Sequence, residues 1–287
     1  LSADGRYLVS GSYDKSLRLW ELSSGKCVRE FIGHTSWVRS CALSADGRYL
    51  LSGSDDKSLR LWELSSGECV REFIGHKKRV TSCALSADGW YLVSGSDDAS
   101  LRLWELSSGE CAREFIGHKK RVTSCALSAD GRYLVSGFSN ASLRLWELSS
   151  GDCVREFIGH KQSVSSCALS ADGRYLISGS DDSSLRLWEL SSGDCVREVI
   201  GHTSRVTSCA LNADGRYLVS SSSDGTVRYW SLETGETIKV IFHAPESNYL
   251  TTDGKQQTIL AKSEYAWRYF NGYFTNKNGE PESFPVV

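Results

Sequence analysis

A histidine, a serine, an aspartate and a tryptophan recur in this order along the 287-residue chain. The first set is His34, Ser52, Asp56 and Trp62. Serine, histidine and aspartate are the groups of a hydrolase triad, in which the histidine activates the serine hydroxyl as the nucleophile. The same groups can instead form a buried relay. The indole N–H then donates to the serine, the serine O–H to the histidine, and the second histidine N–H to the carboxylate.

The set occurs in five copies, and this repetition decides between the two readings. The further copies are His76, Ser94, Asp98 and Trp104; His118, Ser136, Asn140 and Trp146; His160, Ser178, Asp182 and Trp188; and His202, Ser220, Asp224 and Trp230. A catalytic constellation has no reason to be copied into every unit, whereas a structural relay does, since each hydrogen bond contributes about 0.5–1.5 kcal/mol. We therefore expect structural tetrads and no catalytic residue.

Asn140 is the one departure from this pattern. An asparagine keeps an acceptor oxygen but loses the charge-assisted hydrogen bond to His118. We predict that the unit containing Asn140 is the least rigid of the complete units.

The sets belong to a repeat of 42 residues. The unit Gly33–Ile74 recurs from Gly75, Gly117, Gly159 and Gly201, and residues 1–32 match its later part. A fixed period in the forties indicates a repeat architecture. Each unit divides into four short strands, which in one repeat are 80–84, 91–96, 100–106 and 111–116. Asp-Gly turns suit the tight connections between them.

The GH pair, the Asp-Gly turn, SGSDD and LRLW resemble the WD40 (Trp-Asp) repeat family over residues 1–242, although Trp-Glu mostly replaces Trp-Asp here. The resemblance implies an all-β propeller of four-stranded antiparallel blades and identifies the His-Ser-Asp-Trp sets as the family's structural tetrads. We predict seven blades, with the first incomplete. The divergent tail, residues 243–287, is predicted to form a degenerate last blade, because Asp253-Gly254 and AWRYF echo the repeat. An unrelated extension is the alternative.

The composition is typical of a soluble globular protein. Hydrophobic residues make up 40% of the chain and the net charge is −2, which gives no general reason to expect nucleic-acid binding. No apolar run approaches the roughly 18 residues of a membrane-spanning helix, and no signal peptide opens the chain. Because the chain lacks methionine and starts within a repeat, we expect it to be a piece of a longer protein.

The ten cysteines fall into two series, one on the outermost and one on the innermost strand of each unit. They are Cys27, Cys69, Cys111, Cys153 and Cys195, and Cys41, Cys83, Cys125, Cys167 and Cys209. Three strand spacings, about 14 Å, separate the two strands, whereas a disulfide needs Cα atoms within about 7 Å. No CxxC pair suggests a metal site. We expect buried or half-buried thiols, no cofactor and a reducing, cytoplasmic setting.

The near-identical repeats differ mainly in two kinds of loop, which a blade places on the same rim. One follows the GH pair and the other contains the conserved Asp. In the family this rim is the top face and the usual partner surface. Trp and Arg are frequent at binding hot spots, so the candidate anchors are Trp37, Arg79, Arg121 and Arg205, accompanied by Tyr13, Lys77, Lys119, Asp55 and Asp97. The alternative is neutral drift in exposed loops.

The sequence thus predicts a non-catalytic scaffold, monomeric as a ring, that binds other proteins or peptides on its top face. We expect it to be a module of a larger regulatory or signalling protein. One alternative is a small ligand in the central channel, near Ser40, Ser82, Ser124, Ser166 and Ser208. Nucleic-acid binding by the two Lys-Lys-Arg loops is another, but Asp55, Asp97 and Asp181 on the same rim oppose it.

Overall fold

The computed structural model describes residues 1–116, 120–212, 215–244, 248–254 and 259–262. All the helix or strand structure in these residues is β-strand, which confirms the predicted all-β class. The chain divides into two compact units, Leu1–Leu169 and Ser170–Val287.

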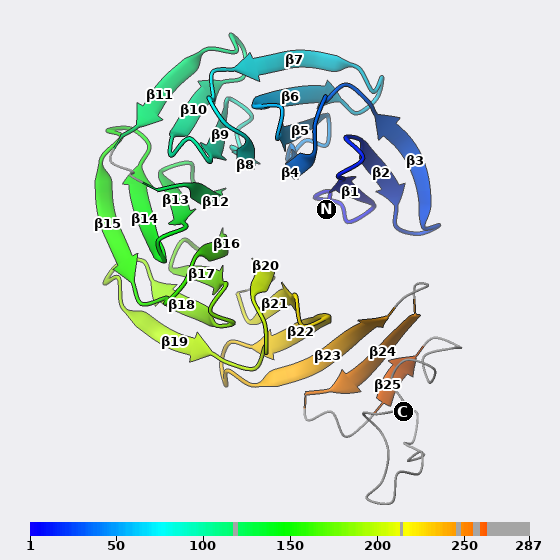
Figure 1. Ribbon diagram of the computed structural model, residues 1–287, viewed down its shortest axis with the longest axis vertical. Coiled ribbons are helices and arrows are strands. Elements are labelled where there is room, and N and C mark those ends of the chain that lie inside the picture. Colours follow the sequence, from blue (N-terminus) through cyan, green and yellow to red (C-terminus); the bar gives the residue numbers. More distant parts are fainter. Residues whose placement is uncertain (117–119, 213–214, 245–247, 255–258, 263–287) are drawn as a thin grey trace, which may run out of the picture. The chain divides into compact units, whose positions relative to one another are not determined.

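The first unit contains four antiparallel sheets and one further strand (Figure 1). The first sheet has three strands, β1 (Tyr7–Gly11), β2 (Leu17–Glu21) and β3 (Lys26–Phe31). The second consists of β4 (Val38–Leu43), β5 (Tyr49–Ser54), β6 (Ser58–Glu63) and β7 (Cys69–Ile74). The third consists of β8 (Val80–Leu85), β9 (Tyr91–Ser96), β10 (Leu101–Glu105) and β11 (Cys111–Phe115). The fourth consists of β12 (Val122–Leu127), β13 (Tyr133–Phe138), β14 (Ser142–Glu147) and β15 (Cys153–Ile158), and β16 (Val164–Leu169) ends the unit.

The second unit contains a run of three strands, which belong to the fifth sheet, followed by the six-stranded sixth sheet. The three strands are β17 (Tyr175–Ser180), β18 (Leu185–Glu189) and β19 (Cys195–Val199). The six-stranded sheet consists of β20 (Val206–Leu211), β21 (Tyr217–Ser222), β22 (Thr226–Ser231), β23 (Thr237–Ala244), β24 (Asn248–Asp253) and β25 (Ile259–Lys262).

Each four-stranded sheet has the predicted order of strands from the inner to the outer edge, and the sheets pack face against face. The second strand is buried at five of its six positions in β9, as expected for a strand covered on both sides. Between the first two sheets, Phe31 packs edge-to-face on Trp62 with ring centroids 5.9 Å apart, beside Leu17 and Leu50. Burying each such side chain contributes about 1.5–3 kcal/mol.

The last sheet differs from the prediction. Over the described residues the strands form six sheets, so the expected seven blades are wrong there. Strands β24 and β25 extend the sixth sheet beyond β23. Earlier outer strands carry an edge glutamate such as Glu72, which discourages further pairing. In β23 the position equivalent to Glu72 is occupied by Val240, which is fully buried, because β24 covers that edge. The AWRYF segment lies outside the described residues.

The outer cysteines also differ from the prediction. Cys27, Cys69, Cys111, Cys153 and Cys195 are exposed rather than buried, whereas the inner series is partly or fully buried. The outer strand is a sheet edge with one face toward solvent, so a small side chain there stays accessible. All ten cysteines lie within the described residues, and none of them forms a disulfide. Over the described residues no helix is long and apolar enough to span a membrane.

Candidate functional site

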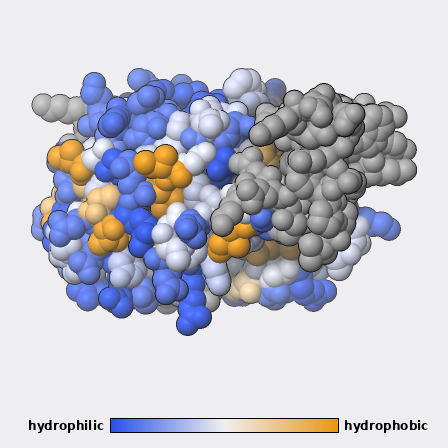
Figure 2. Space-filling view, turned by 90° about the horizontal axis from the view of Figure 1, so that it is seen from below, coloured by the Kyte–Doolittle hydropathy of each residue, from blue (hydrophilic) through white to orange (hydrophobic). Residues whose placement is uncertain are grey.

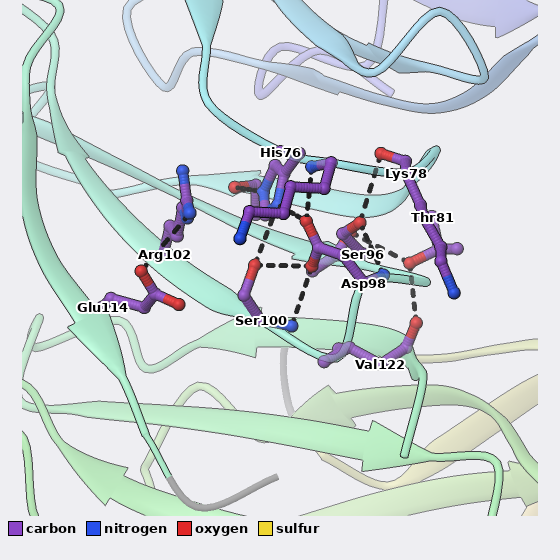
Figure 3. Close-up of polar contacts among 12 residues, drawn as sticks. His76, Lys78, Thr81, Ser96, Asp98, Ser100, Arg102, Glu114 and Val122 are labelled. Carbon is purple, nitrogen blue, oxygen red and sulfur yellow. Dashed lines mark hydrogen bonds and ion pairs between the residues drawn. The ribbon is translucent and has the colours of Figure 1, made fainter. Parts of the chain in front are cut away.

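Three tetrads each have all four residues described and within a single unit, two in the first unit and one in the second. In each of them the four side chains form a continuous chain of hydrogen bonds. In the third sheet Trp104 Nε1–H donates to Ser94 Oγ at 2.8 Å. Ser94 Oγ is 2.7 Å from His76 Nε2, and His76 Nδ1 is 3.1 Å from Asp98 Oδ2. Figure 3 shows Asp98 and Ser100 together beside His76, and the Ser100 hydroxyl is 3.0 Å from the same Nδ1.

The tetrads of the second and sixth sheets repeat this geometry. The His34 nitrogens lie 2.7 Å from Ser52 and 2.7 Å from Asp56, and Trp62 donates to Ser52 at 2.8 Å. In the sixth sheet the distances from His202 are 2.8 Å to Ser220 and 2.7 Å to Asp224, and Trp230 donates to Ser220 at 2.8 Å.

The protonation of a tetrad follows from its surroundings. Burial acts to raise the pKa of Asp224, but hydrogen bonds from Thr226 and His202 outweigh it and lower that pKa to about 2. Bonds of the same kind, against the same effect of burial, lower the pKa of Asp56 and Asp98. Burial lowers the pKa of His202, with Asp224 opposing. In the sixth sheet a neutral His202 therefore donates Nδ1–H to the ionised Asp224 and accepts at Nε2 from Ser220.

This arrangement leaves the serines without access to a substrate. Ser52 and Ser94 are fully buried, and His34 and His76 are at most 6% exposed. A serine nucleophile must reach a bound carbonyl, whereas here each hydroxyl is enclosed between an indole and an imidazole. The geometry suits a structural relay.

The remaining sets are described only in part. Trp146 donates to Ser136 at 2.9 Å, while Asn140 accepts from Ser142 at 3.0 Å. Its partner His118 lies outside the described residues. In the fourth set Trp188 donates to Ser178 at 2.8 Å. The remaining members of that set are His160, in the first unit, and Asp182, in the second.

In four repeats whose two variable loops lie within one unit, these loops lie side by side, because a backbone hydrogen bond joins them. The N–H of the residue before the conserved Asp or Asn donates to the carbonyl three residues after the GH pair. The pairs are Asp55 to Trp37 at 2.8 Å, Asp97 to Arg79 at 3.1 Å, Ser139 to Arg121 at 3.1 Å and Ser223 to Arg205 at 3.0 Å. We call the edge formed by these loops the top rim.

An aromatic stack occupies the top rim of the first two sheets. The Tyr13 and Trp37 rings lie 4.4 Å apart with an interplanar angle of 21°, and Tyr13 is 62% and Trp37 43% exposed. The guanidinium of Arg39 lies 4.9 Å from the Trp37 ring and 5.2 Å from the Tyr13 ring. Asp55 accepts two hydrogen bonds from Arg39, at 2.8 and 2.9 Å, so the cation is fixed against both rings.

A second cluster lies on the rim of the third and fourth sheets. Arg79 Nε donates to Asp97, and Arg121 Nη1 lies 3.7 Å from the same carboxylate. The side chain of Asp97 is only 11% exposed, whereas that of Arg121 is 54% exposed. A cavity of about 200 Å³ is lined by Arg39, Arg79, Thr81, Asp97, Arg121 and Thr123, which connects the two clusters.

The other predicted rim residues are less informative. Lys77 is exposed, and its backbone N–H donates to Asp98 at 2.7 Å. Arg205, in the second unit, donates to Ser223 at 2.9 Å. Lys119 lies outside the described residues.

Arg39 is a rim residue that the sequence reasoning missed. Its position is occupied by Thr81, Thr123, Ser165 and Thr207 in the other repeats, so comparison of the repeats contained the signal. It was overlooked because it lies within strand β4 rather than in a loop.

The inner strands offer little to a channel ligand. Ser40 Oγ accepts from the Cys83 N–H and Ser82 Oγ from the Cys125 N–H, both at 3.0 Å. Figure 3 shows Thr81 pointing toward Val122, whose carbonyl accepts its hydroxyl at 2.7 Å. These hydroxyls join neighbouring sheets. No His/Cys/Asp/Glu group suited to a metal occurs among the described residues.

Exposed apolar side chains do not form one large patch on the face that Figure 2 shows; they lie there in small groups among hydrophilic residues. The outer strands contribute many of the exposed apolar side chains, including Val70 at 48% and Ile74 at 75% exposure. Large contiguous apolar patches usually mark interaction sites, so the mixed top rim remains the better candidate.

Comparison with known proteins gives repeated matches to one family and short matches to individual proteins. The family model "WD domain, G-beta repeat" matches residues 1–21, 25–63, 67–105, 109–147, 151–189 and 193–231. The chain is similar to Lissencephaly-1 homologs of Heterostelium pallidum (53% identity over 34 residues) and Dictyostelium discoideum (50% over 34 residues). It is also similar to the Nuclear distribution protein PAC1 of Arthroderma otae, with 54% identity over 37 residues. These matches cover 12–13% of this chain and 8% of each relative.

Proposed function

The chain belongs to the WD40 repeat family, and on that premise we propose that it is a non-catalytic scaffold that binds proteins or peptides through its top rim. It acts in the cytoplasm, without a cofactor and as a monomer, as a module of a larger regulatory or signalling protein. The matched relatives share less than one repeat with it, so they support the family and leave its partner open.

The observation that carries this proposal is the contact among residues that differ between otherwise uniform repeats. Tyr13 and Trp37 come from different sheets and stack, and Arg39 joins them to Asp55. Independent drift of exposed loops has no reason to produce an aromatic pair with a cation fixed against it. Rigid strands position these loops, which is how binding surfaces are commonly built.

A capture experiment with matched variants tests this proposal. The immobilised chain is compared with a top-rim variant (Trp37→Ala, Arg79→Ala and Arg121→Ala) and an opposite-rim variant (Arg48→Ala, Trp90→Ala and Arg132→Ala). The two variants remove the same residue types, and all three proteins are first checked for equal melting temperatures. We expect specific partners from native lysate to be lost with the top-rim variant alone. Loss with the opposite-rim variant alone, or equal retention by all three, would contradict the proposal.

A further inference from the structure

We infer that the rim cluster of the first unit binds a short acidic peptide segment with an apolar side chain beside its carboxylates. The rim cluster consists of Tyr13, Trp37, Arg39, Asp55, Arg79, Asp97 and Arg121. This inference rests on the proposed scaffold function and names the class of partner.

The first argument is an unbalanced charge at Arg121. In the third sheet Arg79 pairs with Asp97 of its own repeat. The equivalent acidic position in the fourth sheet is Ser139, so among the described residues the acidic partner of Arg121 is Asp97 of the neighbouring repeat, at 3.7 Å. That carboxylate already accepts from Arg79 Nε. Arg121 thus keeps most of its donors free and its side chain 54% exposed, which suits a bidentate bond to an incoming carboxylate.

The second argument is the size of the adjoining cavity. At about 200 Å³ it is smaller than the roughly 300–1,000 Å³ of pockets that enclose a small molecule. It therefore suits one side chain of a peptide. Thr81 cannot turn its hydroxyl toward a ligand without losing its bonds to the carbonyls of Gly95 and Val122, so the arginines supply the polar contacts.

The third argument is the aromatic stack beside this cavity. Arg39 lines the cavity and also lies against both Tyr13 and Trp37. Its bidentate bond to Asp55 holds the stack in place, so the exposed ring surface is preorganised. An apolar side chain next to the acidic residue can cover this surface, and aromatic platforms of this kind are typical of binding hot spots.

The surrounding charges favour a peptide over a nucleic acid. Lys77, Lys78 and Lys120 are exposed on the same loops and attract an acidic segment. Asp97, however, lies against both Arg79 and Arg121, and Asp55 lies against Arg39. A nucleic-acid strand has a phosphate at every nucleotide and would meet these carboxylates, whereas a peptide can space its acidic residues around them.

The test is fluorescence anisotropy with a labelled peptide, Gly-Glu-Leu-Gly-Glu-Leu-Gly. The comparison probes have Gln in place of Glu, Ala in place of Leu, or are oligothymidine of seven nucleotides. The key variant is Ser139→Asp, which restores the aspartate found at this position in other repeats. The new carboxylate should pair with Arg121, while every arginine of the rim cluster is kept. Arg121→Gln and Trp37→Ala complete the set, and Arg132→Gln on the opposite rim is the control.

We expect the Glu-Leu peptide to bind best, and Ser139→Asp and Arg121→Gln each to weaken it about tenfold, the effect of one charge-assisted bond. Trp37→Ala should weaken this peptide but leave the Ala peptide unaffected, and Arg132→Gln should change nothing. Equal binding of the Gln peptide, no effect of Ser139→Asp, or tighter binding of oligothymidine would overturn the inference.

The same variants separate this inference from the proposed function. Partners that are lost with the triple top-rim variant but retained by Ser139→Asp would leave the scaffold standing and overturn the acidic-peptide class. Retention of all partners by the triple variant would instead contradict the scaffold function itself.

Discussion

Replacing Ser94 by alanine should destabilise the third sheet far more than the same substitution at Ser10 in the first sheet. Ser94 is fully buried and serves both Trp104 and His76. Ser94→Ala leaves an indole N–H and an imidazole nitrogen unpaired, each costing about 1–3 kcal/mol when buried. The expected loss in the free energy of unfolding is the sum for the two groups, about 2–6 kcal/mol.

Ser10 is the matched control. It accepts a hydrogen bond from Trp20 at 2.9 Å, but its sheet has no histidine to form the second hydrogen bond of a tetrad serine. Both Ser10 and Trp20 are only half-buried. Water can replace the lost acceptor there, so Ser10→Ala should cost about 0.5–1 kcal/mol.

Two measurements check this difference. Urea unfolding followed by tryptophan fluorescence gives the overall loss. Because a repeat array need not unfold in one step, hydrogen exchange read by mass spectrometry locates the loss to the altered sheet. If both substitutions cost the same within about 0.5 kcal/mol, the histidine link adds nothing and the reasoning from the relay is refuted.

Three further predictions follow from the tetrads and the turns beside them. First, a carboxylate whose pKa is lower in the folded than in the unfolded state stabilises the fold at pH values above the unfolded pKa. The contribution of Asp224, with its pKa lowered to about 2, should therefore disappear as pH falls from about 4 to 2. Urea unfolding at each pH measures the free energy of unfolding, and Asp224→Asn should flatten its dependence on pH. Second, Ala99 and Gly225 share a left-handed backbone, with φ of 68° and 81°; Ala99→Gly should raise and Gly225→Ala lower the free energy of unfolding by about 0.5–1 kcal/mol, and equal signs for the two would contradict this. Third, Asn140→Asp should slow amide exchange in its own repeat and leave the others unchanged; faster exchange elsewhere in the wild type than in the Asn140 repeat would be contrary to expectation.

Much of the fold could be predicted from the sequence because the copies of the repeat can be compared with one another within the chain. The strand 91–96 was predicted from its unbroken apolar run and is strand β9. The predicted count of seven blades was wrong over the described residues, where β24 pairs with β23 instead of starting a new blade. Pairing at a free edge depends on which strand is within reach, and the Asp-Gly echo in the tail carries no information about that.

For the candidate site, the sequence predicted several of the residues but not the contacts among them. Repeat comparison selected Trp37, Arg79 and Arg121 as rim residues. It could not show that Arg121 lies next to Asp97 of the neighbouring repeat, because that contact depends on how two sheets face each other. It also passed over Arg39, whose strand position gave no sign that its side chain reaches the rim.

The sequence by itself determined the period, the strand order within each repeat and the groups available to each tetrad, because these depend on local pattern and on chain distance. Tertiary structure alone decided the count of sheets, the exposure of the outer cysteines and the stacking of Tyr13 on Trp37. Those features arise from contacts between repeats or from the free edge of a sheet. A sequence pattern within one repeat does not specify which surface a neighbour covers.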